Sequence, residues 1–170
     1  METNFDTKPK LGIGACLLGQ KVRFDGGHKR EQFLTDLFGR FVEWVPICPE
    51  VEVGMGVPRE PIQLVAADDR PTRLAGVESD TNWTDRMQAW AAERIGALRA
   101  LGVSGFVLKA RSPSCGPRDV PVSGGPPSPG MFAEALMLAI PGLPMDDEER
   151  LRDPEARADF LARVASFYRG

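Results

Sequence analysis

Short apolar runs and longer helical patterns follow one another along the chain. Each short run is bounded by glycine, proline or polar residues, which is typical of strands. The predicted strands span residues 10–18, 42–47, 62–66, 72–77 and 105–110. The third and fourth flank the polar turn 68–71, so they predict a hairpin at a sheet edge.

Other segments carry apolar residues at helical spacing. These predicted helices span residues 28–41, 80–101, 131–139 and 153–170. The Gly/Pro-rich segment 120–130 predicts a loop over the functional site. The order of the elements predicts an α/β fold, a single three-layer α/β/α (Rossmann-like) domain with a mainly parallel sheet and an edge hairpin. We expect a flexible tail over residues 1–9, the domain over 10–152 and a helix packed on it over 153–170.

Composition narrows the class of protein. The chain has 170 residues and a net charge of −3, which gives no overall attraction to nucleic acid or membranes. No apolar run approaches the roughly 20 residues that a membrane span needs, and the polar N-terminus lacks the core of a signal peptide. Three cysteines make a disulfide framework improbable, so we expect a cytoplasmic protein.

Three of the predicted strands end close to a cysteine. Cys16, Cys48 and Cys115 stand where parallel strands finish, which is the edge at which open α/β sheets bind ligands. Thiolates bind zinc, copper(I) and iron–sulfur clusters. Three separate core cysteines are the alternative, but glycine or proline beside each thiol favours a shared site. His28 fits a solvated helix cap better than a fourth ligand.

Several polar residues accompany these cysteines. Asp25 follows the first strand, Glu50 lies two residues after Cys48, and Ser112 and Ser114 flank Cys115. A buried carboxylate near a metal could move a proton or activate water. Hydrogen bonds to nearby backbone groups are an equally good explanation for Glu50 and Ser112. Lys109 ends a buried strand, where an unpaired lysine is rare.

Basic residues are concentrated in the same loops, whereas a run of acidic residues occupies 146–149. The basic residues are Lys21, Arg23, Lys29, Arg30, Arg59, Lys109, Arg111 and Arg118. They could attract an anionic substrate such as a nucleotide or RNA. A solvated surface with salt bridges explains the same pattern.

Five segments in order resemble the thiouracil desulfurase family. They are ACLLGQKVRFDGGHK (15–29), PICPEVEVGMGVPREPIQLV (46–65), GFVLKARSPSCG (105–116), MFAEAL (131–136) and LPMDDEERLRDP (143–154). The resemblance covers nearly the whole chain. The final helix is similar to the segment that joins this domain to a second domain in longer relatives.

The resemblance implies a [4Fe-4S] cluster held by Cys16, Cys48 and Cys115. It further implies that the iron without a protein ligand binds the sulfur of a thiolated pyrimidine, thiouracil or 4-thiouridine, and that water replaces this sulfur with release of sulfide and no net redox change. The residues expected to take part are Glu50, Ser112 and Asp25 as catalytic groups, and Arg23, Lys109 and Ser114 as substrate-binding groups.

Two other functions fit the same pattern of residues. A cluster-bearing sensor or RNA-binding module would bind its ligand without turnover. A zinc hydrolase would use three cysteines and a water. The choice among free base, nucleoside and tRNA as substrate or partner stays open at this point, as do the preference for a 2-thio or 4-thio group and the oligomeric state.

Overall fold

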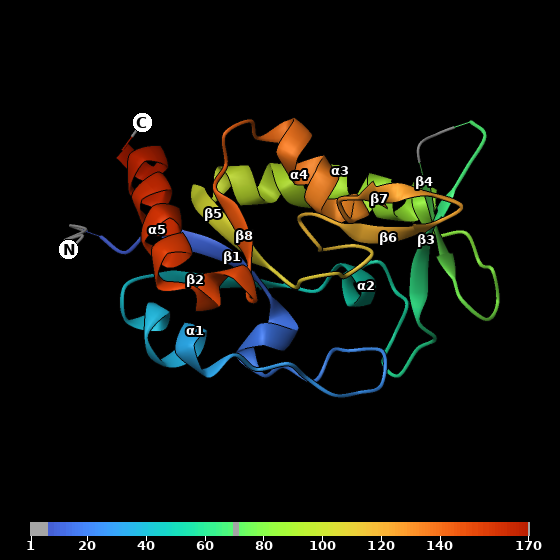
Figure 1. The fold of residues 1–170 in the computed structure, drawn as a ribbon, viewed down its shortest axis with the longest axis horizontal. Coiled ribbons are helices and arrows are strands. Elements are labelled where there is room, and N and C mark those ends of the chain that lie inside the picture. The colour runs from blue at the N-terminus through green and yellow to red at the C-terminus, as the bar shows by residue number, and fades with distance from the viewer. Residues whose placement is uncertain (1–6, 70–71, 170) are drawn as a thin grey trace.

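Four parallel strands form the central sheet of the molecule. In the computed structural model, which describes residues 7–69 and 72–169, their order is β2-β1-β5-β8 (Figure 1). These strands are β1 (Lys10–Gly14), β2 (Glu43–Ile47), β5 (Val103–Leu108) and β8 (Met145–Asp147). The chain passes from β1 to β2 on one side and later returns to β5 on the other. The carboxyl ends of β1 and β5 therefore border a topological switch point, where ligands bind.

A second sheet has the strand order β4-β3-β6-β7. It consists of β3 (Ile62–Ala66), β4 (Thr72–Gly76), β6 (Val120–Ser123) and β7 (Gly125–Ser128). The first two strands form an antiparallel hairpin, and β6 joins β3 in parallel. The predicted hairpin is thus confirmed with its outer strand at a sheet edge, although that edge belongs to the second sheet. Arg70 and Pro71 of the predicted turn lie outside the described residues.

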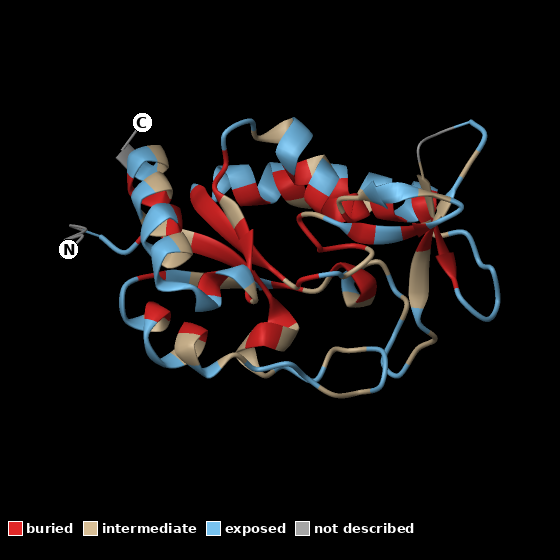
Figure 2. Cartoon of the chain, in the orientation of Figure 1, coloured by how far each residue is buried: buried red, intermediate tan, exposed pale blue. Residues whose placement is uncertain are grey.

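Helices cover both faces of the central sheet. Their bounds are α1 (Gln32–Asp36), α2 (Pro49–Glu52), α3 (Thr84–Ala100), α4 (Met131–Ala139) and α5 (Pro154–Arg169). One core cluster joins α3 and α4 to both sheets, with Phe106 and Phe132 fully buried. A second cluster joins α1 and α5 to the opposite face, around Leu11, Ile13 and Phe160. Figure 2 shows β5 buried throughout between these layers, and the predicted three-layer α/β fold is confirmed.

The predicted continuous helix over 28–41 is wrong in its first turn and is interrupted further on. Only α1 and the 3-10 turn Phe38–Arg40 are helical there. The N–H groups of Lys29 and Glu31 donate to carbonyls of the 3-10 turn Ala15–Leu18, which follows β1. Residues with backbone groups committed to another segment cannot start a helix, so the chain stays irregular up to α1. The same 3-10 turn shortens the first predicted strand, which ends at Gly14.

The predicted loop over 120–130 is also wrong, since it contains β6 and β7. In β6, Val120 and Val122 are buried and alternate with exposed neighbours. The prolines of β7 are tolerated because this strand lies at the edge of its sheet. Strand β8 was not predicted, because its sequence is polar.

The two ends of the chain pack differently. Pro9 is buried, and its carbonyl accepts a hydrogen bond from the Glu43 N–H at 2.9 Å. The rest of the predicted tail falls largely outside the described residues. Helix α5 buries Phe160 and Val164 against the central sheet. Within the described ranges, no helix has the length and apolar character required to cross a membrane.

Candidate metal centre

Three cysteines follow three adjacent strands of the central sheet. Cys16 lies in the 3-10 turn after β1, Cys48 comes directly after β2, and Cys115 lies in the loop after β5. All three are free thiols, and all three line one cavity of about 510 Å³. Because parallel strands present their carboxyl ends at one edge, the fold brings together thiols that are far apart in the sequence.

Backbone hydrogen bonds fix the first two cysteines. The Cys16 carbonyl accepts hydrogen bonds from the Gly19 N–H at 3.1 Å and the Lys29 N–H at 3.0 Å. The Cys48 N–H donates to Glu52 Oε2 at 3.2 Å, and α2 begins at the next residue with a proline. A carboxylate in the first turn also complements the positive end of a helix. Each of these two cysteines is therefore held by hydrogen bonds of its own backbone.

The loop of Cys115 is held from within and by helix α4. The Cys115 N–H donates to Ser112 Oγ at 3.1 Å, and the Gly116 N–H donates to the Ser112 carbonyl at 2.8 Å. The first N–H groups of α4 donate to the carbonyls of Pro113 and Ser114, each at 2.9 Å. These bonds give partners to N–H groups at the start of the helix that have none within it, and they also hold the loop in place.

Replacing Gly130 by Ala should destabilise this arrangement. A Cβ atom there would lie 2.7 Å from the Ser114 carbonyl oxygen and 2.8 Å from that of Ser112. Such overpacking against backbone should lower the free energy of unfolding by about 1–3 kcal/mol in chemical denaturation. Gly96→Ala is the matched control, since a Cβ there meets nothing within 4 Å. In the middle of α3 it should raise stability by roughly 0.5–1 kcal/mol, and equal effects of the two substitutions would contradict this account.

Burial and a neighbouring carboxylate favour protonated thiols in the absence of a cation. Burial, reinforced by Glu50, raises the pKa of the Cys16 thiol to about 11 and that of Cys48 to about 12. The same two causes raise the pKa of Cys115 well above its ordinary value. Since the thiolate is the form that binds metals, loading of the site must displace these protons.

The donors suit a cluster better than a single ion. Across residues 7–69 and 72–169, no three Cys, His, Asp or Glu side chains are grouped so that they could hold one metal ion. In a cubane each thiolate binds a different iron, so the sulfurs stand farther apart than the ligands of one zinc ion. His28 offers no fourth ligand, because it is exposed, lies outside the cavity lining, and its Nδ1 accepts the Arg30 N–H at 3.1 Å. Three soft donors around one cavity thus fit a cluster with one open iron.

Glu50 is a buried carboxylate that lies close to two of the cysteines of the cavity. Its side chain is on α2, it is 9% exposed, and it lines the cavity. Oε1 accepts the Ser114 hydroxyl at 2.5 Å, and Oε2 accepts the Cys48 thiol at 3.5 Å. Ser112 also lines the cavity, and its Oγ is 3.2 Å from that of Ser114. Ser114 is fully buried behind them and does not line the cavity.

The family model of the 2-thiouracil desulfurases matches residues 11–148, which include all three cysteines and the cavity-lining carboxylate. The chain belongs to the 2-thiouracil desulfurase family. This membership confirms the resemblance drawn from the five sequence segments.

Two known proteins are similar to this member of the desulfurase family. A solved structure described as the [4Fe-4S]-dependent thiouracil desulfidase TudS is 28% identical, with a TM-score of 0.70. The match covers 91% of this chain and 99% of that one. The uncharacterized protein YbbK of Bacillus subtilis is 27% identical over 108 residues, which are 61% of this chain and 71% of the relative. The TudS likeness thus extends over almost the whole fold.

Asp25 lies outside the cavity of this desulfurase-family chain, in contrast to Glu50. It is exposed, its Oδ1 accepts the Gly27 N–H at 2.9 Å, and its Oδ2 is 3.8 Å from Arg23 Nη1. These contacts are those of a turn residue. Arg23 does line the cavity, with its guanidinium 5.4 Å from the centre of the Phe24 ring.

Charges around the cavity nearly balance. The basic lining residues are Arg23, Lys29, Arg59, Lys109, Arg111 and Arg152, and the acidic ones are Glu31, Glu50, Glu60, Glu148 and Glu149. Several of them pair, as Arg111 does with Glu149 at 2.5 Å. Arg30 and Arg118, expected near the site, pair with Asp36 and Asp146 outside the lining. Attraction of an anionic substrate is therefore weaker than the sequence suggested.

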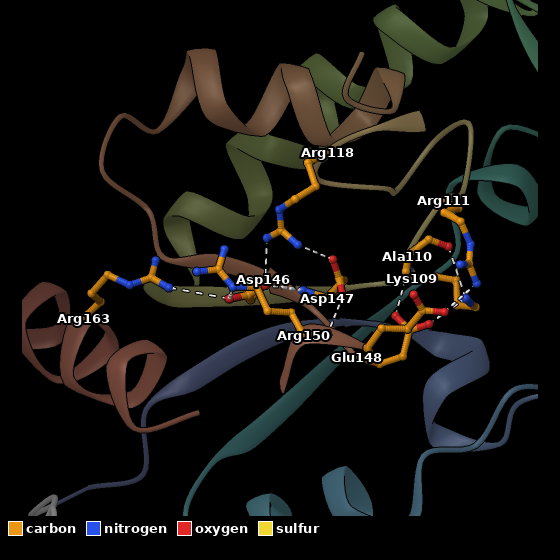
Figure 3. Close-up of polar contacts among 10 residues, drawn as sticks. Lys109, Ala110, Arg111, Arg118, Asp146, Asp147, Glu148, Arg150 and Arg163 are labelled. Atoms are coloured by element: carbon orange, nitrogen blue, oxygen red, sulfur yellow. Dashed lines mark hydrogen bonds and ion pairs between the residues drawn. The ribbon is translucent and has the colours of Figure 1, made fainter. Parts of the chain in front are cut away.

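Glu148 is the cavity residue that sequence reasoning missed. It follows β8 directly and is 2% exposed. It binds Lys109, the lysine that the sequence had placed at the end of a buried strand (Figure 3). The signal that could have found it is this lysine, which needed a buried partner, together with the acidic run 146–149, which reads as solvated in the sequence alone.

Proposed function

We propose that this chain removes sulfur from a thiolated pyrimidine with a [4Fe-4S] cluster held by Cys16, Cys48 and Cys115. The proposal rests on three thiols from three parallel strands that share one cavity with a buried carboxylate. Family membership and the [4Fe-4S]-dependent neighbour support it. Three free thiols also suit a reducing compartment such as the cytoplasm.

The reaction is a hydrolysis. The carbon–sulfur double bond of the ring is replaced by a carbon–oxygen double bond from water, and sulfide leaves with the two protons of that water. Electrons balance without an oxidant or a reductant. A bound cluster with one open iron supplies a Lewis acid for the thiocarbonyl sulfur.

Glu50 is the residue best placed to move the proton. It lines the cavity, and its Oε1 is held by the Ser114 hydroxyl. A carboxylate in this position can take a proton from the attacking water. Ser112, whose hydroxyl lies at the cavity wall, positions the ring or the water. Arg23 and Lys109, which both line the cavity, bind the substrate.

Ser114 should act through Glu50 and not on the substrate. Removal of its hydroxyl in Ser114→Ala takes away a hydrogen bond to a charged group, so the desulfuration rate should fall by about 10- to 100-fold with iron content unchanged. Ser104→Ala is the control, because Ser104 is equally buried but donates to the Gly102 carbonyl away from the cavity. Loss of iron in Ser114→Ala would contradict this assignment.

The decisive experiment is anaerobic reconstitution with iron and sulfide, followed by metal analysis and assay. Release of sulfide and loss of the thiocarbonyl absorbance are expected with 2-thiouracil, 4-thiouracil or 4-thiouridine. A 4-thiouridine-containing tRNA forms a separate arm. The cavity has the size of a small-molecule site, and the balanced charges favour a base or nucleoside over tRNA. A full iron complement with no loss of thiocarbonyl in any arm would refute the proposal, and zinc in place of iron would favour a hydrolase.

A further inference from the structure

Lys109 and Glu148 form a buried ion pair in the wall of the cavity. Glu148 Oε1 accepts a hydrogen bond from Lys109 Nζ at 2.6 Å, and Oε2 accepts the Ala110 N–H at 2.7 Å (Figure 3). Both side chains line the cavity. One carboxylate thus fixes the ammonium group and the backbone that leads into the Cys115 loop.

A second set of ion pairs holds the strand that carries Glu148. Asp146 Oδ1 accepts Arg118 Nη2 at 2.7 Å, and Asp147 Oδ1 accepts the Arg150 N–H at 2.9 Å. Figure 3 shows this group beside the Lys109 pair, at the other end of the same short segment. Strand β8 pairs with β5 in parallel register. Glu148 is therefore fixed in position, and it holds the Lys109 side chain in place.

The ammonium group retains one donor for a ligand. An ammonium has three N–H donors and no acceptor. Two are used, by Glu148 and by the Ala110 carbonyl at 3.1 Å. No other acceptor for Lys109 Nζ occurs in the described part of the chain, and its side chain is 20% exposed at the cavity. The third donor is available to whatever enters.

We infer that Lys109, positioned by Glu148, selects pyrimidines that carry an exocyclic oxygen and disfavours those with an amino group in that place. This inference rests on the proposed desulfuration. A ring carbonyl accepts the free donor, whereas an exocyclic amino group would face it donor to donor. A desolvated donor left without an acceptor is costly, so the preference follows from the pair itself.

The chemistry of the ring makes the selection independent of where the sulfur is. In 2-thiouracil the oxygen is on C4, and in 4-thiouracil it is on C2. In both rings sulfur and oxygen flank N3, so one donor serves either isomer. In 2-thiocytosine the group across N3 from the sulfur is an amino group. Lys109 thus discriminates between rings with an oxygen and rings with an amino group at this place, but not between 2-thio and 4-thio isomers.

The test compares rings that carry an exocyclic oxygen with rings that carry an amino group in its place, in binding as well as turnover. Pyrimidin-4(3H)-one and 4-aminopyrimidine, which differ only in this group, are titrated calorimetrically into anaerobically reconstituted protein, and kcat/KM is measured for 2-thiouracil and 2-thiocytosine. The double variant Lys109→Met/Glu148→Gln removes both charges and leaves no lone buried carboxylate. Lys21→Met is the matched control, because Lys21 is exposed and lies outside the cavity lining.

The wild type should favour pyrimidin-4(3H)-one over 4-aminopyrimidine, and 2-thiouracil over 2-thiocytosine, by about 10- to 100-fold. Both ratios should fall close to one in the double variant and stay unchanged in Lys21→Met. Glu148→Gln should raise KM for 2-thiouracil more than it lowers kcat, because it loosens the lysine without removing it.

The outcomes separate this inference from the proposed function. A double variant that keeps the wild-type ratio overturns the inference, and so does a wild type that binds pyrimidin-4(3H)-one and 4-aminopyrimidine equally. A wild type that prefers the oxo ring but releases no sulfide contradicts the proposed function and leaves the selection standing. If the double variant does not fold, the test uses Glu148→Gln alone. An unchanged ratio of oxo to amino rings in that variant also overturns the inference.

Discussion

Cys115→Ala is expected to remove the cluster and the activity together. Cys115 is one of three thiols at the cavity and the one most deeply buried, at 5% exposed. Two thiolates on separate turns should not retain a cubane, because the sequence has no fourth cysteine to replace the lost one. We expect iron and acid-labile sulfide after anaerobic reconstitution to fall to less than about a tenth of the wild-type amounts.

The control for this result is the apoprotein. Without metal, the substitution removes only one small buried side chain, so the thermal unfolding of apo Cys115→Ala should lie within a few degrees of apo wild type. A variant that folds and keeps its iron would show that Cys115 is no ligand. If apo Cys115→Ala is unfolded, the same measurements are made on Cys16→Ala, because the Cys16 thiol is less buried.

Glu50→Gln should have the second largest effect, on rate and not on cluster content. Glutamine keeps the shape of the side chain and can still accept the Ser114 hydroxyl, but it cannot take a proton. Loss of a general base typically costs about 10²- to 10⁴-fold in kcat. Single-turnover consumption of 2-thiouracil, with iron measured in the same sample, separates the two properties.

Glu43→Gln is the matched control for Glu50→Gln. Glu43 begins strand β2, is exposed and lies outside the cavity lining, so its substitution should leave the rate within about twofold. Glu50→Gln protein with full iron and an unchanged rate would remove Glu50 from the mechanism. Loss of iron in that variant would instead assign Glu50 to the integrity of the cluster.

The thiols could be found in one cavity from sequence alone, because the relevant signals are local. Apolar runs mark the strands β1, β2 and β5, and each cysteine comes at or after a strand end. Parallel pairing then brings these ends to one edge without any further knowledge of side-chain contacts. Helices 131–139 and 154–169 could also be predicted from the sequence, because their apolar residues recur at helical spacing and a proline starts the second helix.

The missed features depend on contacts between distant segments. Strand β8 is three residues long and polar, so no hydrophobic periodicity predicts it. Its acidic side chains are buried because they form ion pairs with Arg118, which lies far away in the sequence. The segment 28–31 was included in a predicted helix whose apolar pattern begins at Phe33, but Lys29 and Glu31 donate their N–H groups to the turn after β1. Likewise, Asp25 and Glu50 both follow predicted strand ends in the sequence, and only the fold shows one outside and the other inside the cavity.

The two sides of the cavity differ in mechanical character. The Cys115 loop is bonded to the first turn of α4, and that helix is packed on α3 in the main core, so this side of the cavity is anchored to the core. The opposite side, residues 19–31, contains no helix or strand and is tied down by isolated backbone bonds, such as the one from Arg59 to Phe24. The Cys115 side of the cavity is therefore expected to be more rigid than the 19–31 segment.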